Sequence, residues 1–137
     1  MKAQLDENLP RGLARALNSI AKTDEHEIIH VLDLVAPGTS DVDLFKASMD
    51  AGVQVHVTQD HHNRRPIERE AIARSGLIVF VLAKGWSSLT LYDKAARLIE
   101  WWPRIMDQAE LITPPAMFRV PVRKVNKGRF EPIKVVR

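Results

Sequence analysis

Aspartates follow several segments that the sequence predicts to be strands, and together their carboxylates would suit metal chemistry. Asp6 comes after the predicted strand at 2–5, and Asp60 comes after the alternating segment at 53–58. Asp41 stands at the start of a predicted helix that follows the strand at 27–32. The carboxyl ends of parallel strands, and the helix starts that follow them, meet at one edge of a sheet. Clustered carboxylates repel each other, and Mg²⁺ or Mn²⁺, which prefer oxygen ligands, would relieve that repulsion.

Some neighbouring polar residues have simpler explanations than a ligand role. Ser40 and Asp43 have the spacing of a helix capping box, which accounts for Asp43. Asp41 lacks that explanation, so we assign it to the site. Glu7 is expected at the protein surface, and Asn8 fits equally well as the N-cap of the first helix or as a site residue.

Basic side chains follow the third and fourth predicted strands on the same sheet edge. Arg64, Arg65 and Lys84 would contact the phosphates that flank a scissile bond, and arginine offers bidentate contacts there. The alternative for Arg64 and Arg65 is that they are solvated loop charges. His61 and His62 are adjacent rather than four residues apart as in zinc proteases, so we expect them to face solvent or substrate.

Alternating elements would position these residues. The predicted strands lie at 2–5, 27–32, 53–58 and 77–83, and the predicted helices begin at Pro10 and cover 41–51, 66–75 and 90–109. Successive strand–helix units indicate an α/β fold with a mostly parallel sheet and right-handed crossovers. In the last helix Pro103 should kink or split the helix. Its apolar stripe places Trp102 in the core, whereas Trp101 faces elsewhere and is a candidate partner contact.

Composition excludes several functional classes. The 137 residues contain no cysteine, which rules out disulfides, thiolate metal sites and a cysteine nucleophile. The longest apolar run, residues 77–83, is too short to span a bilayer as a helix, and the first residues lack the apolar segment of a signal peptide. We therefore expect a single cytoplasmic domain over 1–137, with its core over about 1–110 and no membrane partner. The sequence leaves the oligomeric state open, and a homo-oligomer is compatible with it.

The carboxyl-terminal segment is strongly basic. Residues 117–137 hold seven basic residues against Glu131 alone, a net charge of +6, which leaves −3 for residues 1–116 because the whole chain carries +3. The turn signal at 126–128 predicts a β-hairpin, and Pro121 and Pro132 favour an edge position for it. This basic β-hairpin would face a polyanion or an acidic partner, or it would be only a solvated edge.

Several stretches resemble the PIN-like domain family and, more narrowly, its VapC-type toxin branch. The resemblance covers residues 2–106 and rests on LDENLP at 5–10, GTSD at 38–41, TQD at 58–60, RRPIEREA at 64–71 and SGLIVFVLAKGW at 75–86. It implies a three-layer α/β/α fold and a metal-dependent ribonuclease, with RNA as substrate. It also implies the toxin role in a type II toxin–antitoxin system, with a cognate antitoxin as partner.

The resemblance also assigns the metal ligands. Asp6, Asp41 and Asp60 match the three acidic elements of the family, and Asp43 is the candidate for the fourth acid. His62 and Asn63 stand where related families carry a further aspartate and a phenylalanine, so the sequence departs from the family pattern at these two positions.

Two other functions remain open from the sequence alone. A receiver-like signalling domain also gathers acids at strand ends, with Asp60 as its phosphoacceptor and Lys84 as the lysine after a late strand. A non-catalytic interaction module with a decayed nuclease site is the second alternative. Phosphate trapping on one carboxylate would identify the receiver, and metal binding without RNA cleavage would identify the module.

Overall fold

A six-stranded sheet forms the centre of the computed structural model, which describes residues 1–59, 66–123 and 129–135. The strands are β1 (Lys2–Leu5), β2 (Glu27–His30), β3 (Val55–Gln59), β4 (Ile78–Leu82), β5 (Ala116–Val120) and β6 (Glu131–Ile133). Their spatial order is β2-β1-β3-β4-β5-β6, with all pairs parallel except the antiparallel pair of β5 and β6. The predicted mostly parallel α/β sheet is therefore confirmed.

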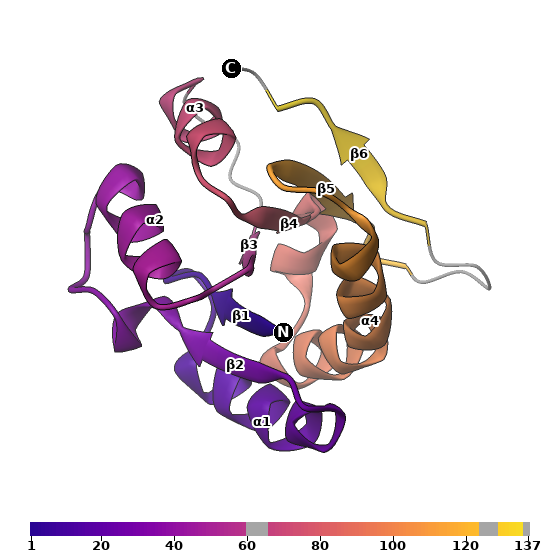
Figure 1. Ribbon diagram of the computed structural model, residues 1–137. Helices are drawn as coiled ribbons and strands as arrows, with labels where there is room; N and C mark the ends of the chain where they lie inside the picture. Colours follow the sequence, from indigo (N-terminus) through magenta and orange to yellow (C-terminus); the bar gives the residue numbers. More distant parts are fainter. Residues whose placement is uncertain (60–65, 124–128, 136–137) are drawn as a thin grey trace.

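Helices cover both faces of this sheet and give three layers (Figure 1). The helices are α1 (Arg11–Ala21), α2 (Asp41–Asp50), α3 (Pro66–Arg74) and α4 (Leu91–Leu111), joined by the short 3-10 turns η1 (Lys22–Asp24), η2 (Val31–Asp33) and η3 (Lys84–Ser88). Helices α1 and α4 pack on one face through an apolar cluster that includes Leu13 and Ile105. Helices α2 and α3 pack on the other face through a second cluster that includes Phe45 and Ile72. The α/β/α layering is thus the predicted one.

Local sequence signals explain where α2 begins and ends. Ser40 accepts a hydrogen bond from the backbone N–H of Asp43 (3.2 Å), which satisfies one of the unpaired amide groups at the start of α2. Gly52, with a φ of +78°, follows the carboxyl end of the helix in the left-handed conformation that glycine adopts without strain. The predicted helix boundaries at 41–51 therefore hold to within one residue.

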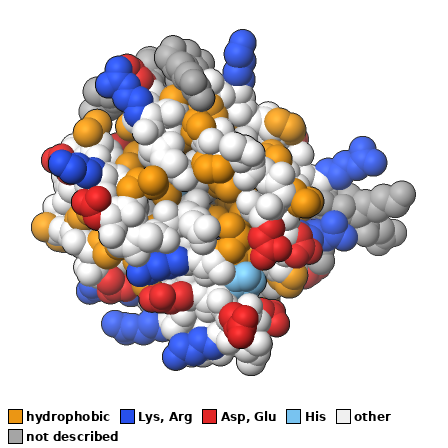
Figure 2. Space-filling view, in the orientation of Figure 1, with side chains coloured by type: hydrophobic (Ala, Val, Ile, Leu, Met, Phe, Trp, Pro, Cys, Tyr) orange, Lys and Arg blue, Asp and Glu red, His pale blue; other side chains and the backbone are white. Residues whose placement is uncertain are grey.

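The basic carboxyl-terminal segment is part of the central sheet. Strand β5 is its fifth parallel strand, and Met117 and Val120 in it are buried. Strand β6, with Pro132, forms the edge, as the prolines predicted. Residues 126–128, where the turn was predicted, lie outside the described residues. On the face drawn in Figure 2, acidic and basic side chains both lie along the edge of the molecule, and basic side chains project at the right-hand end.

The structure differs in two respects from what the sequence led us to expect for α4: Trp101 is buried, and of the kink or split expected at Pro103 the split does not occur. Trp101 does not face a partner: it is 1% exposed, and the ring of Phe130, just before β6, covers it with ring centroids 5.1 Å apart. The helical stripe alone could not reveal this second covering surface. Pro103 does not split the helix, which is continuous from Leu91 to Leu111. Buried residues on both sides of the proline, Leu98 and Ile105 among them, hold the two halves on one core.

Candidate functional site

The strand order reverses direction between β1 and β3, and the carboxyl ends of these two strands lie side by side. In open α/β sheets this switch point is where ligands bind. Asp6 directly follows β1, and its backbone N–H donates to the carbonyl of Val57 in β3 (2.8 Å). Its carboxylate is 24% exposed, so it is reachable from solvent but held by the protein.

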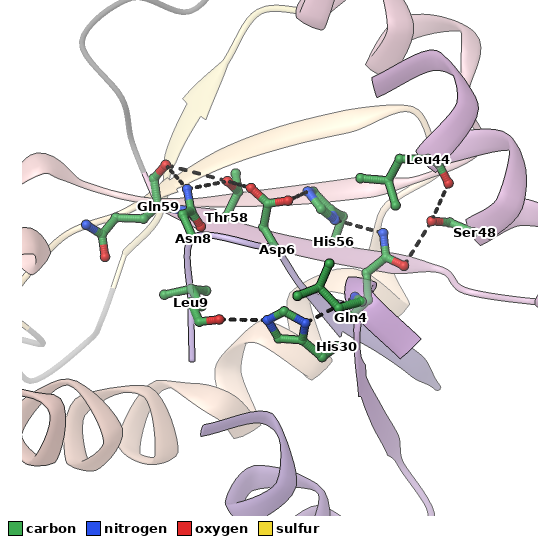
Figure 3. A network of polar contacts seen from close by, with 11 residues as sticks. Gln4, Asp6, Asn8, Leu9, His30, Leu44, Ser48, His56, Thr58 and Gln59 are labelled. Atoms are coloured by element: carbon green, nitrogen blue, oxygen red, sulfur yellow. Dashed lines mark hydrogen bonds and ion pairs between the residues drawn. The ribbon is translucent and has the colours of Figure 1, made fainter. Parts of the chain in front are cut away.

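Two residues of β3 flank the Asp6 carboxylate, one at each oxygen (Figure 3). The Thr58 hydroxyl donates to Asp6 Oδ2 (2.8 Å), and His56 Nε2 lies 3.8 Å from Asp6 Oδ1. Thr58 and His56 are both buried. Because a side chain fixed by two neighbours loses little freedom when it binds a ligand, Asp6 is preorganised for a role in the site.

Asp41, the first residue of α2, lines a pocket together with Asp6. A cavity of about 340 Å³ is lined by Asp6, Glu7 and Asn8 after β1, by Val31, by the loop residues Val35, Gly38 and Thr39, and by Asp41 and Leu44 of α2. The structure therefore brings Asp6 and Asp41 to one pocket. Asp43 is exposed and does not line this pocket.

Glu7 is exposed, as expected, and it also holds a loop beside the pocket in place. Its Oε1 accepts a hydrogen bond from the backbone N–H of Gly38 (3.0 Å), in the loop that leads to α2. Gly38 has a φ of +77°, which favours glycine at this position. Glu7 thereby fixes the loop that leads to Asp41.

Asn8 is not the N-cap of α1, because Pro10 occupies that position, but it does line the candidate pocket. The Asn8 amide pairs with the backbone of Gln59: Nδ2 donates to the carbonyl (3.2 Å), and Oδ1 accepts from the N–H (3.4 Å). This side chain extends the pairing of β1 and β3 past the end of β1. It fixes the end of β3 immediately before Asp60.

The other predicted site residues are placed as follows. Lys84 begins η3 two residues after the end of β4, at the carboxyl edge of the sheet, and is exposed. Asp60, Arg64 and Arg65 lie outside the described residues. Among residues 1–59, 66–123 and 129–135, no three histidine, cysteine or acidic side chains are close enough together to hold a metal ion.

Comparison with known proteins identifies the family. A family model described as a PIN-like domain matches residues 1–84, which is more than half of the chain and includes β1 to β4. The chain belongs to the PIN-like domain family. PIN-like domains are commonly nucleases and generally use divalent metals, so the fold is of a nuclease type. The chain has no match among curated proteins and none among solved structures. In the described residues no helix is long and apolar enough to cross a membrane.

The chemistry of this PIN-like pocket suits a hard divalent cation. Asp6 and Asp41 line it, and carboxylate oxygens are ligands that Mg²⁺ and Mn²⁺ prefer, whereas Glu7, also in the lining, bonds the loop at Gly38. His56 is not a ligand, because Gln4 bonds its Nδ1 and its Nε2 faces Asp6. The described residues therefore contribute two candidate oxygen ligands from different elements, Asp6 and Asp41, and Asp60 follows β3, which pairs with β1.

Lys94 is a cation near this edge that sequence reasoning missed. It lies in the first turn of α4, and its Nζ donates to Gln59 Oε1 (2.7 Å) at the end of β3. Burial lowers the pKa of Lys94 because it penalises the charged ammonium. Only the three-dimensional packing of α4 beside β3 reveals this contact, since 35 residues separate the two partners.

Sequence reasoning also missed a buried polar network formed by Gln4, Ser48 and His56. Gln4 and Ser48 are fully buried, and His56 is 3% exposed. The signal that could have found them is the position of Gln4 and His56 inside otherwise apolar strands, where polar residues are rarely buried without a partner.

Proposed function

We propose that this PIN-like domain is a divalent-metal-dependent endoribonuclease in which Asp6, Asp41 and Asp60 hold Mg²⁺ or Mn²⁺. One observation carries the proposal: Asp6 and Asp41 come from different elements and line one pocket at the switch point of a nuclease-type fold. Asp60 follows β3 in the sequence, and β3 pairs with β1, the strand that Asp6 directly follows. Asp43, which does not line this pocket, is left out of the proposed ligand set.

The residues of the chain would divide the work of hydrolysis. The bound ion would supply a water of lowered pKa and would neutralise charge on the phosphate. Thr58 orients the Asp6 carboxylate. Glu7 accepts a hydrogen bond from Gly38 and so holds the loop that precedes Asp41. Lys84 and Lys94 provide positive charge at the carboxyl edge, where the phosphates of a bound strand would lie, and Arg64 and Arg65 are further candidates for that role.

Cleavage of a mixed RNA pool with and without Mg²⁺ or Mn²⁺ tests this function. The wild-type protein should cleave only with the metal, and Asp6→Asn should remove the activity because it deletes a charge and keeps the side-chain size. The loss should exceed the roughly 10–100-fold that follows removal of a ligand's neighbour. Asp24→Asn, an exposed aspartate of η1, is the matched control and should cleave normally. Wild-type cleavage by Asp6→Asn would contradict the assignment.

We further propose that the protein is the toxin of a type II toxin–antitoxin system. The basic segment at 117–137 supports a polyanionic or acidic partner, and Arg123 and Arg129 in it are exposed. Expression of the wild-type chain alone should slow growth of a bacterial host, and co-expression of the neighbouring small open reading frame should relieve the effect. Asp6→Asn should be harmless. Normal growth with soluble wild-type protein present would refute the toxin role.

The receiver-like alternative shares one feature with the structure, namely the strand order 2-1-3-4-5 in the parallel part of the sheet. A receiver would take a phosphoryl group from acetyl phosphate onto one aspartate, most directly Asp60. Intact-mass measurement after incubation with acetyl phosphate and Mg²⁺ separates the two functions. A nuclease gains no phosphoryl mass, and a stable gain abolished by Asp60→Asn would support the receiver instead.

A further inference from the structure

The buried polar network, Gln4, Ser48 and His56, connects three elements behind the candidate metal pocket (Figure 3). The Ser48 hydroxyl donates to Gln4 Oε1 (2.9 Å), and Gln4 Nε2 bonds His56 Nδ1 (2.8 Å). His56 Nε2 then faces Asp6 Oδ1 at 3.8 Å. A continuous line of polar contacts therefore runs from α2 through β1 and β3 to the carboxylate of Asp6.

Gln4 connects Ser48 to His56 through the two ends of its amide group. The single proton of the Ser48 hydroxyl has two acceptors within reach, Gln4 Oε1 (2.9 Å) and the backbone carbonyl of Leu44 (2.8 Å). His56 Nδ1 lies on Gln4, so Nε2 is the ring nitrogen that faces Asp6. The ring of Phe45 stands edge-on against His56 (centroids 5.3 Å, 75°) and keeps the imidazole in this orientation.

Gln4 is the junction between the two elements that carry the candidate ligands. It lies two residues before Asp6 on β1, and its register partner on β3 is His56. Ser48 lies about two helical turns after Asp41, so both residues are on the same side of α2. The bond between Ser48 and Gln4 therefore ties α2 to β1 and contributes to the spacing of Asp41 and Asp6.

Stability alone does not account for this network. Burying amide, hydroxyl and imidazole groups costs free energy that their hydrogen bonds only offset, and apolar residues of similar shape can replace such a set with little loss. The corresponding layer on the other side of the sheet is filled by Ala3, Leu5, Val55 and Val57. Because the polar network ends on Asp6, we infer that it serves the orientation of this carboxylate at the pocket.

We propose that Gln4, Ser48 and His56 are positioning residues that set the geometry between Asp6 and Asp41 and so determine the metal affinity of the site. The proposal rests on the metal-dependent function proposed above. None of the three residues contacts the metal or the substrate in this arrangement. They act through the orientation of Asp6 and the placement of α2.

Mn²⁺ binding by isothermal titration calorimetry tests the proposal, together with thermal unfolding in the absence of metal. The variant Gln4→Leu/Ser48→Ala/His56→Leu replaces the whole network by apolar groups. Its unfolding temperature should stay close to that of the wild type, whereas its Mn²⁺ dissociation constant should rise about 10–100-fold. A purely structural network gives the opposite pattern, with lowered stability and unchanged affinity in the folded protein.

Asn18→Ala is the matched control. Asn18 Oδ1 accepts from the N–H of Ile28 (2.9 Å) and so ties α1 to β2 without reaching the pocket. This variant should lose stability and keep wild-type Mn²⁺ affinity. If the triple variant fails to fold, Ser48→Ala alone decides the matter, because it removes the hydroxyl furthest from Asp6 and should still weaken Mn²⁺ binding several-fold.

The outcomes separate this inference from the function on which it rests. Absence of Mn²⁺ binding by the wild type overturns both. Binding by the wild type that Asp6→Asn abolishes, with wild-type affinity in the folded triple variant or in Ser48→Ala, overturns the positioning role and leaves the metal-dependent function standing.

Discussion

The two faces of the sheet differ most at β1 and β3. On the α1/α4 face these strands contribute only apolar side chains to the core, whereas on the α2/α3 face they contribute Gln4, His56 and Thr58. In β4 both faces are apolar, as Phe80 and Val79 show. Buried polar side chains are thus concentrated in the two strands that end at the pocket. This difference indicates that one face mainly stabilises the fold and that the other also orients the site.

The largest effect is expected on the apolar face. Phe80 is fully buried and stacks on Phe118 with ring centroids 5.5 Å apart and planes 26° apart. Phe80→Ala should lower the free energy of unfolding by about 3–5 kcal/mol, because it leaves a cavity in addition to the lost apolar burial. Urea unfolding measures this loss. If the α1/α4 face only stabilises the fold, the folded variant keeps wild-type Mn²⁺ affinity. A large loss of affinity would contradict the distinction between the two faces of the sheet.

A smaller effect is expected within the buried polar network. Gln4→Leu and His56→Leu should each lower the free energy of unfolding by about 1–3 kcal/mol, since each leaves a buried partner without its hydrogen bond. The double variant should cost clearly less than the sum, because neither polar group remains to be satisfied. A double-mutant cycle by urea unfolding checks this coupling. Additive losses would show that the two side chains do not act as one unit.

Local patterns predicted most of the elements because the responsible forces act over a few residues. The apolar run before Lys84 gave β4, and Ser40 and Gly52 marked the ends of α2. Such caps and periodicities are complete within one segment of sequence. The same reasoning predicted that Asp6 and Asp41 lie at one edge, since the edge follows from the parallel topology.

Contacts between distant segments explain what the sequence did not predict. Trp101 was misplaced because Phe130 covers it from beyond β5, and no helical stripe contains that information. Gln4 and His56 are 52 residues apart and meet only through the register of β1 with β3. The hydrogen bond from the Gly38 N–H to Glu7 likewise needs the folded loop. The buried polar network is therefore visible only in three dimensions.

A smaller effect is expected from the N-caps of α2 and α4, two helices that cover opposite faces of the sheet. Ser40 and Thr90 cap α2 and α4 in the same way, each accepting from the N–H of an aspartate three residues later at 3.2 Å. Ser40→Ala and Thr90→Ala should each cost about 1 kcal/mol in unfolding free energy. Only Ser40→Ala should also weaken Mn²⁺ binding, because Asp41 is the first residue of α2. Equal Mn²⁺ affinities in the two variants would argue against dependence of the site on the start of α2.

The smallest effect is expected at Lys94. This residue lies in α4, a helix of the apolar face, and contacts Gln59 at the carboxyl edge of the sheet. Burial lowers the pKa of Lys94 below its ordinary value of 10.5. Between the lowered pKa and 10.5 the unfolded chain therefore binds more protons than the folded one, and stability due to this group rises with pH. Lys94→Met removes that rise. The free energy of unfolding of the wild type minus that of Lys94→Met, measured in urea, should thus increase as the pH approaches 10.5, by a modest amount because solvent still reaches the side chain. A difference that stays constant with pH would mean that α4 holds Lys94 at the edge without desolvating it.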